Sequence, residues 1–100
     1  MEHYEVRPKD KEILIRMLSA LFPGVKIYLF GSYARGTALR SSDIDIALDT
    51  GRELTLLEIA KAKNVIEALN IIIPVDVVCL NRIPQALREV IQTEGVLWTK

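Results

Sequence analysis

The chain has 100 residues, half of them hydrophobic, and 13 lysines and arginines balance 13 aspartates and glutamates. This length favours a single domain over residues 1–100, with enough apolar residues for one core. A net charge of zero implies no general attraction to anionic membranes or to long nucleic acids, which proteins usually bind with a basic stripe. The polar N-terminus does not resemble a signal peptide and no apolar run could span a bilayer, so we expect a cytoplasmic protein.

The first half of the chain predicts a helix, then two strands with a short turn between them. Apolar residues recur at helical spacing over residues 9–21, and Pro8 fits a first-turn position. Residues 25–30 are rich in β-formers and predict a buried strand, followed by a helical turn over residues 33–35. Residues 43–48 alternate acidic or small residues with aliphatic ones, which indicates a second, half-buried strand.

The second half predicts two more helices and two more strands. Thr55 and Glu58 match a capping box that opens a helix, whose inner face is expected to carry Leu56, Ile59, Ala60, Lys63, Ile66 and Leu69. Residues 75–80 predict a third strand, residues 83–93 a last helix, and residues 96–98 a short terminal strand. This order of elements predicts an α/β or α+β domain with a small mixed sheet flanked by helices.

An acidic pair, Asp43 and Asp45, stands at the start of the second predicted strand. Side chains two positions apart on a strand point the same way, so both carboxylates project from one face while Ile44 and Ile46 point into the core. Neighbouring carboxylates repel each other unless a cation lies between them. Oxygen ligands of this kind suit Mg²⁺, which proteins typically hold with one or two carboxylates and substrate phosphates. The pair therefore predicts a magnesium site.

Asp76 is a third candidate carboxylate, inside the otherwise apolar strand predicted over residues 75–80. Burying a charge there without a partner would be costly. If this strand lies beside the one that carries Asp43, Asp76 completes an acidic cluster. It would then act as a metal ligand and as the group that draws a proton from an attacking hydroxyl.

The segment from Gly31 to Gly36 has the features of a phosphate-binding turn. Gly31 allows a sharp turn and a close approach of the backbone to a ligand. If Ser32 begins a short helix, its N–H groups and hydroxyl can face a phosphate, and Arg35 lies one helical turn further on. The alternatives are Ser32 as a helix cap only and Arg35 as a solvated or structural arginine. Together with a metal, these parts supply what phosphoryl or nucleotidyl transfer requires.

The string Gly31-Ser32, ten residues, then Asp43-Ile44-Asp45 resembles the signature of the DNA polymerase β-like nucleotidyltransferase superfamily. The fuller string from Gly31 to Gly36, with Ser42-Asp43-Ile44-Asp45 after it, is similar to the minimal nucleotidyltransferase (MNT) branch. This resemblance implies the nucleotidyltransferase fold. It also implies that Asp43 and Asp45 bind two Mg²⁺ ions, that Asp76 is the third catalytic carboxylate, and that Gly31 and Ser32 hold the triphosphate.

The stand-alone branch resembles the antitoxin half of HEPN–MNT toxin–antitoxin pairs. The resemblance implies a helical HEPN ribonuclease toxin as partner, and transfer of AMP from ATP to a tyrosine of that toxin, which silences it. ATP is then the substrate, and nucleic acid is not expected as a direct substrate. Two alternatives stay open: a non-catalytic module that inhibits its partner by covering it, and nucleotidyl transfer to a small molecule or RNA.

Four other residues attract structural interpretations. Tyr33 is expected to be a structural aromatic rather than a stacking surface for a base, and Cys79 to lie in the core. Asp49 has the strand parity of the acidic pair but lies beside the turn at Gly51, which favours a surface role. Trp98 is either a core residue or an interface anchor.

Overall fold

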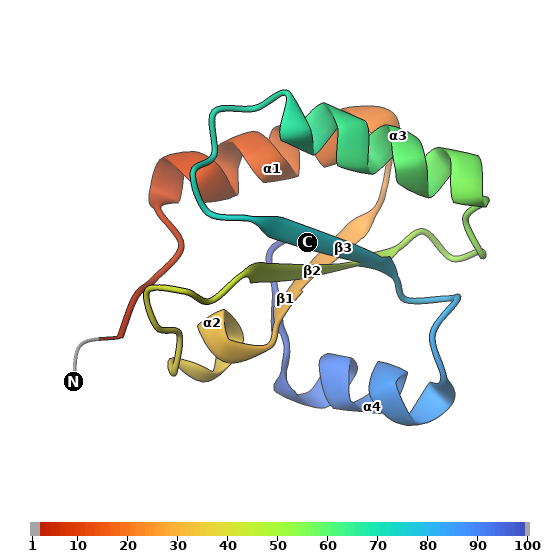
Figure 1. Ribbon diagram of the computed structural model, residues 1–100. Coiled ribbons are helices and arrows are strands. Elements are labelled where there is room, and N and C mark those ends of the chain that lie inside the picture. The colour runs from red at the N-terminus through yellow and green to blue at the C-terminus, as the bar shows by residue number, and fades with distance from the viewer. Residues whose placement is uncertain (1–2, 100) are drawn as a thin grey trace.

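The computed structural model describes residues 3–99, in which a mixed four-stranded sheet has two helices on each face (Figure 1). In chain order the elements are α1 (Pro8–Leu21), β1 (Lys26–Phe30), α2 (Ser32–Arg35), β2 (Ile44–Asp49), α3 (Leu56–Glu67), β3 (Val75–Cys79), α4 (Gln85–Glu94) and β4 (Val96–Leu97). The predicted fold class, a small mixed sheet flanked by helices, is confirmed.

The sheet has the strand order β3-β2-β1-β4. Strand β1 pairs antiparallel with both β2 and β4, whereas β2 and β3 are parallel. A parallel pair needs a crossover connection, which α3 supplies. This crossover makes β3 the edge strand beside β2, so that residues distant in the sequence become direct neighbours.

Helices α1 and α3 cover one face of the sheet, and α2 and α4 lie on the other (Figure 1). The larger core lies under α1 and α3, and its fully buried side chains include Leu14, Leu18, Ile27, Ile44, Ile46, Leu48 and Leu54. A smaller cluster lies under α4 and consists of Ala47, Leu80 and Ile91, with Tyr28, Phe30, Val78 and Ile83 packed against it. Successive residues of each strand therefore face different helices.

The predicted capping box at the start of α3 is confirmed. The Glu58 N–H donates to Thr55 Oγ1 at 3.1 Å, and the Thr55 N–H donates to Glu58 Oε1 at 2.9 Å. Arg52 donates to both carboxylate oxygens of Glu58, at 2.9 and 2.6 Å. These bonds satisfy N–H groups that a helix start would otherwise leave without partners.

The predicted inner face of α3 is wrong in part. Ala62 and Ile66 are the buried residues of this helix, with Ile59 and Leu69 half-buried, whereas Leu56 is 70% exposed and Ala60 and Lys63 are also exposed. Apolar residues occur on most of the circumference of α3, so periodicity alone leaves the orientation of the helix open. Packing against β3 and α1 selects the face that is observed.

The C-terminal segment closes the larger core. The predicted strand over residues 96–98 is shorter, Val96–Leu97, but the Trp98 N–H still donates to Ile27 O at 2.8 Å. The Trp98 ring packs against the larger core, and the Lys11 ammonium lies 5.8 Å from its centroid, which favours the core interpretation of this residue. Within residues 3–99, none of the helices is long and apolar enough to cross a membrane.

Candidate active site

The turn after β1 is built around Gly31, whose backbone adopts φ 74° and ψ −155°. This region is essentially restricted to glycine. A Cβ placed at Gly31 would also collide with the Asp45 carboxylate, since the Asp45 Cγ lies only 3.2 Å from that position. Glycine is therefore required for two separate reasons, and the turn lies against Asp45.

The short helix α2 begins at Ser32, as the phosphate-binding interpretation required. The Gly31 carbonyl accepts from the N–H groups of Ala34 and Arg35 at 3.1 Å each, which fixes the turn. The N–H groups of Ser32 and Tyr33 stand in the first helical turn, where helices have donors to spare for a ligand. Arg35 ends the helix with an exposed side chain.

The three candidate carboxylates lie on the α2 and α4 face of the sheet. Asp45 and Asp76 are register partners on the parallel strands β2 and β3, and Asp43 precedes β2 with the same parity as Asp45. Asp45 is half-buried, and Asp43 and Asp76 are exposed. Asp76 is exposed on an edge strand, so the cost of a buried charge does not arise. Strand β3 does lie beside β2, which was the condition for Asp76 to complete the acidic cluster.

The three carboxylates carry like charges that repel one another. Burial raises the pKa of the Asp45 carboxyl above its usual value, and the charges of Asp76 and Asp43 raise this pKa further. The Arg35 guanidinium acts on the Asp45 pKa in the opposite direction. Arg35 and the acidic residues therefore influence one another electrostatically, and negative charge is in excess among them.

The donor set fits a magnesium ion that completes its shell with ligand oxygens. Within residues 3–99, no group of three His, Cys, Asp or Glu side chains is arranged to hold a metal ion by itself, and this includes Asp43, Asp45 and Asp76. Mg²⁺ does not require such a group, because it is usually held by one or two carboxylates together with phosphates and water. Asp43, Asp45 and Asp76 offer only oxygen donors, and the excess negative charge around Asp45 is what a divalent cation would offset.

Tyr33 joins the site to the core. Its side chain is buried in the larger core, as predicted for a structural aromatic. Burial raises the pKa of the Tyr33 hydroxyl, and the charge of Asp43 raises it further. Asp49, at the far end of β2, accepts from the Gly51 N–H at 3.0 Å in an exposed turn, in agreement with the surface role expected of it. Cys79 is buried, also as expected.

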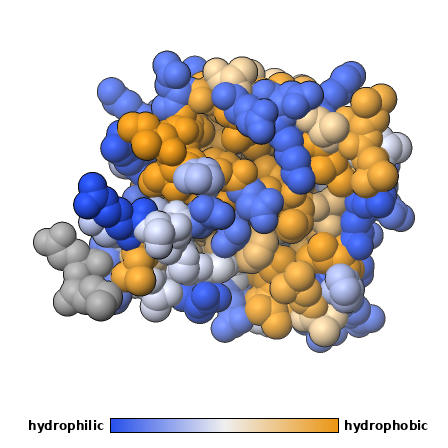
Figure 2. Space-filling view, viewed as in Figure 1, coloured by the Kyte–Doolittle hydropathy of each residue, from blue (hydrophilic) through white to orange (hydrophobic). Residues whose placement is uncertain are grey.

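A cavity of about 220 Å³ beside the turn at Gly31 is lined in part by residues that the sequence did not single out. Its lining residues are Phe30, Gly31, Ala34, Arg35, Leu87, Val90 and Glu94. Leu87 and Val90 of α4 remain 41% and 47% exposed, and hydrophobic surface gathers over this helix (Figure 2). Helical spacing marks these residues as an apolar face, but only the fold shows that this face is left uncovered beside Gly31.

Comparisons with known proteins agree with this geometry. The family model described as polymerase beta, nucleotidyltransferase, matches residues 12–100. The crystal structure of a toxin–antitoxin with AMP-PNP is similar, with a TM-score of 0.72 and 32% identity over 93% of this chain and 73% of that chain. No curated protein matches the chain.

Two further solved structures contain toxin–antitoxin pairs. A mutant of the MntA–HpeT toxin–antitoxin has a TM-score of 0.73 and 27% identity over 89% of this chain and 71% of that chain. A tri-AMPylated Shewanella oneidensis HEPN toxin in complex with MNT antitoxin has a TM-score of 0.70 and 27% identity over 91% of this chain and 70% of that chain. The chain therefore belongs to the polymerase beta nucleotidyltransferase family, and minimal nucleotidyltransferase antitoxins are among its structural neighbours.

Proposed function

We propose that this protein is a Mg²⁺-dependent adenylyltransferase that acts in the cytoplasm as an antitoxin, by transferring AMP from ATP to a tyrosine of a HEPN toxin. The observation that carries this proposal is the register pairing of Asp45 with Asp76 beside the turn at Gly31. In this function Asp43, Asp45 and Asp76 are the catalytic and metal-binding carboxylates. Gly31, Ser32 and Arg35 bind the triphosphate.

The reaction is a displacement at the α-phosphorus of ATP. The tyrosine oxygen forms a bond to this phosphorus, the bond to the oxygen that bridges to the β-phosphate breaks, and pyrophosphate leaves with that electron pair. Asp76, the more exposed partner of the Asp45–Asp76 pair, accepts the phenolic proton. Bound Mg²⁺ would neutralise the phosphates and align the attack. The N–H groups of α2 and the Arg35 guanidinium hold the departing pyrophosphate.

Three of the similar solved structures support this proposal by their bound nucleotide, their modified toxin or their substituted residues. One toxin–antitoxin structure holds AMP-PNP, and another holds a tri-AMPylated HEPN toxin with its MNT antitoxin. A third is a mutant pair in which two aspartates, two positions apart, are replaced by glutamates. That spacing is the spacing of Asp43 and Asp45 in this chain.

The direct test uses ATP labelled at either end of the triphosphate. The purified chain, Mg²⁺ and the cognate HEPN toxin are incubated with ATP that carries label in the α- or in the γ-phosphate. The proposal expects α-label on the toxin and γ-label in released pyrophosphate. Label from the γ-phosphate on the toxin would indicate a kinase, and no label from either position would remove the catalytic claim.

A second candidate function is inhibition by covering the toxin, without chemistry. The uncovered apolar face of α4, with Leu87 and Val90 exposed, favours it because such a face suits a protein partner. The double variant Asp43→Ala with Asp45→Ala discriminates between the two functions in cells. Neutralisation of the toxin at equal expression would show that covering is sufficient, whereas loss of neutralisation would show that catalysis is required.

A further inference from the structure

The connection from α3 to β3 is a run of apolar residues at the protein surface. It contains Leu69 and the three consecutive isoleucines 71–73. Ile72 is 82% exposed, the highest value among the exposed large hydrophobic residues of the described chain, and Ile71 and Ile73 are half-buried. Hydrophobic surface appears over this connection in the space-filling view (Figure 2). Exposed consecutive apolar residues are unfavourable unless they serve binding.

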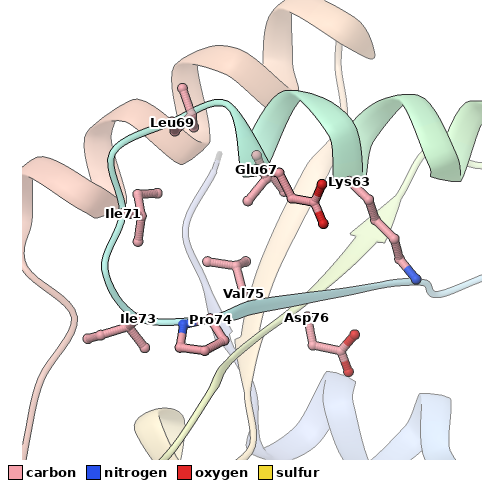
Figure 3. A pocket seen from close by; sticks show the side chains of 9 residues that line it. Lys63, Glu67, Leu69, Ile71, Ile73, Pro74, Val75 and Asp76 are labelled. Atoms are coloured by element: carbon pink, nitrogen blue, oxygen red, sulfur yellow. The ribbon is translucent and has the colours of Figure 1, made fainter.

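This apolar connection borders two cavities. The larger, of about 380 Å³, lies between α3 and β3 and is lined by Lys63, Ile66, Glu67, Leu69, Ile71, Ile73, Pro74, Val75 and Asp76 (Figure 3). The other, of about 360 Å³, lies toward the start of α1 and shares Leu69 and Ile71 with it. The isoleucine segment therefore lies between the two cavities, and together they form one continuous surface.

The larger cavity adjoins the candidate active site across one strand. Asp76 lines the cavity and is also the register partner of Asp45. Val75 packs on the larger core, toward α3, whereas Asp76 points to the other side of β3 (Figure 3). Because β3 is an edge strand, a molecule that reaches over this edge meets Asp76 on one face and the cavity on the other.

The geometry of the proposed reaction indicates that the acceptor enters at the β3 edge of the sheet. This inference rests on the proposed function. In a displacement at phosphorus, the attacking and leaving oxygens are in line on opposite sides. The pyrophosphate is assigned to Gly31 and Arg35, at the end of β1. Strand β2, with Asp45, lies between β1 and β3. The acceptor therefore enters from the β3 side, over Asp76.

We propose that the cavity between α3 and β3, together with Ile72, is the docking surface for a protein acceptor. It takes a large aliphatic or aromatic side chain that neighbours the modified tyrosine. Six of the nine described lining residues are apolar, which suits an apolar side chain, and the other three are charged. Its described lining residues include one cation, Lys63, and two anions, Glu67 and Asp76, whereas an RNA acceptor would require a cationic surface for its phosphates. The acceptor class is therefore protein.

The test compares Asp substitutions of two exposed apolar residues, one in the connection after α3 and one in the first turn of α3. Ile72→Asp changes the docking surface, and Leu57→Asp is the matched control because Leu57 is 70% exposed near the start of the helix. Both side chains are mostly exposed, and thermal unfolding checks that each variant folds like the parent. The probes are the cognate HEPN toxin and ATP labelled in the α-phosphate, with KM and kcat measured for both substrates.

The expected result is a KM for the toxin roughly tenfold higher in Ile72→Asp, since a charge now opposes burial of an apolar anchor. Its KM for ATP and its kcat at saturating toxin remain those of the parent, and Leu57→Asp changes none of these values. An unchanged KM for the toxin in Ile72→Asp would overturn the inference. So would label on RNA instead of protein, or a dimer of this chain that Ile72→Asp converts to monomer.

Failure of the proposed function is distinguishable from failure of this inference. If the unmutated chain transfers no label, the proposed catalysis is wrong. The docking surface is then measured through the affinity of the toxin without nucleotide. Weaker binding of the toxin by Ile72→Asp than by Leu57→Asp still supports the surface, and equal binding overturns it.

Discussion

Asp45 and Asp76 stand directly opposite each other on the parallel strands β2 and β3, with Asp45 half-buried and further opposed by Asp43. An arrangement that crowds negative charge lowers stability in the absence of a cation. We therefore expect Asp45→Asn to raise the melting temperature of the metal-free protein at neutral pH. A gain of about 0.5 kcal/mol corresponds to roughly 2–4 °C in a domain of this size.

Calorimetry with and without Mg²⁺ checks this prediction. The ion should raise the melting temperature of the parent protein more than that of Asp45→Asn, because the variant has less charge to neutralise. Asp49→Asn is the control: it lies on the same strand and face, and asparagine retains the oxygen that accepts from the Gly51 N–H. A stabilisation by Mg²⁺ that is the same in all three proteins would contradict the metal assignment.

Gly31→Ala should nearly abolish transfer, because the added Cβ meets the Asp45 carboxylate in a backbone region that excludes alanine. Displacement of a catalytic group by about 1 Å can cost roughly a hundredfold in rate, which sets the expected loss. Gly36→Ala is the matched control, with φ also at 74° but nothing within 4 Å of the added Cβ. Similar losses of transfer in both variants, each normalised to folded protein, would show that the collision with Asp45 is not the cause.

Arg35→Gln should weaken ATP binding because it removes a charged donor for the triphosphate. Hydrogen bonds to charged groups contribute about 1.5–3 kcal/mol, so the KM for ATP should rise by roughly tenfold or more. Arg35→Lys keeps the charge but loses the bidentate fork, and an intermediate KM is expected. An unchanged KM for ATP in Arg35→Gln would support the solvated interpretation of this arginine.

The interaction of Arg52 with Glu58 should make part of the stability depend on pH. The hydrogen bonds from Arg52, and then the N–H of Thr55, lower the pKa of Glu58 from 4.5 to about 2. A lowered carboxyl pKa contributes stability above the unfolded value of 4.5, and this contribution is lost as the pH falls toward about 2. NMR titration of the Glu58 carboxyl carbon should show its pKa rising in Arg52→Gln. If Glu58 titrates identically in the parent and in Arg52→Gln, then Arg52 does not lower the pKa of Glu58.

Much of the site was predictable because its signals are local. The parity of Asp43 and Asp45, the glycine turn and the capping box at Thr55 each depend on neighbouring residues, and the structure confirms their placement. The resemblance to the nucleotidyltransferase signature rests on the same local spacing, and the family match agrees with it. The catalytic roles of these residues remain predictions.

Features that depend on packing between distant segments were not predictable. The exposure of Asp76 follows from the edge position of β3, which depends on the strand order rather than on the apolar residues around Asp76. The orientation of α3 was mispredicted at Leu56 because its apolar residues occur on more than one face. The exposed apolar surfaces at Ile72 and at Leu87 could not be predicted, because their exposure depends on which segments pack beside them in the fold.

We propose that the acidic residues beside Gly31 catalyse adenylyl transfer to a HEPN toxin. The most direct measurement is the rate at which label from the α-phosphate of ATP enters toxin tyrosine in Mg²⁺, compared among the parent, Asp43→Asn, Asp45→Asn and Asp49→Asn. We expect transfer by the parent and by Asp49→Asn, and a loss of at least about a hundredfold in the other two variants. Equal transfer by all four proteins, or no transfer by the parent, would contradict this proposal.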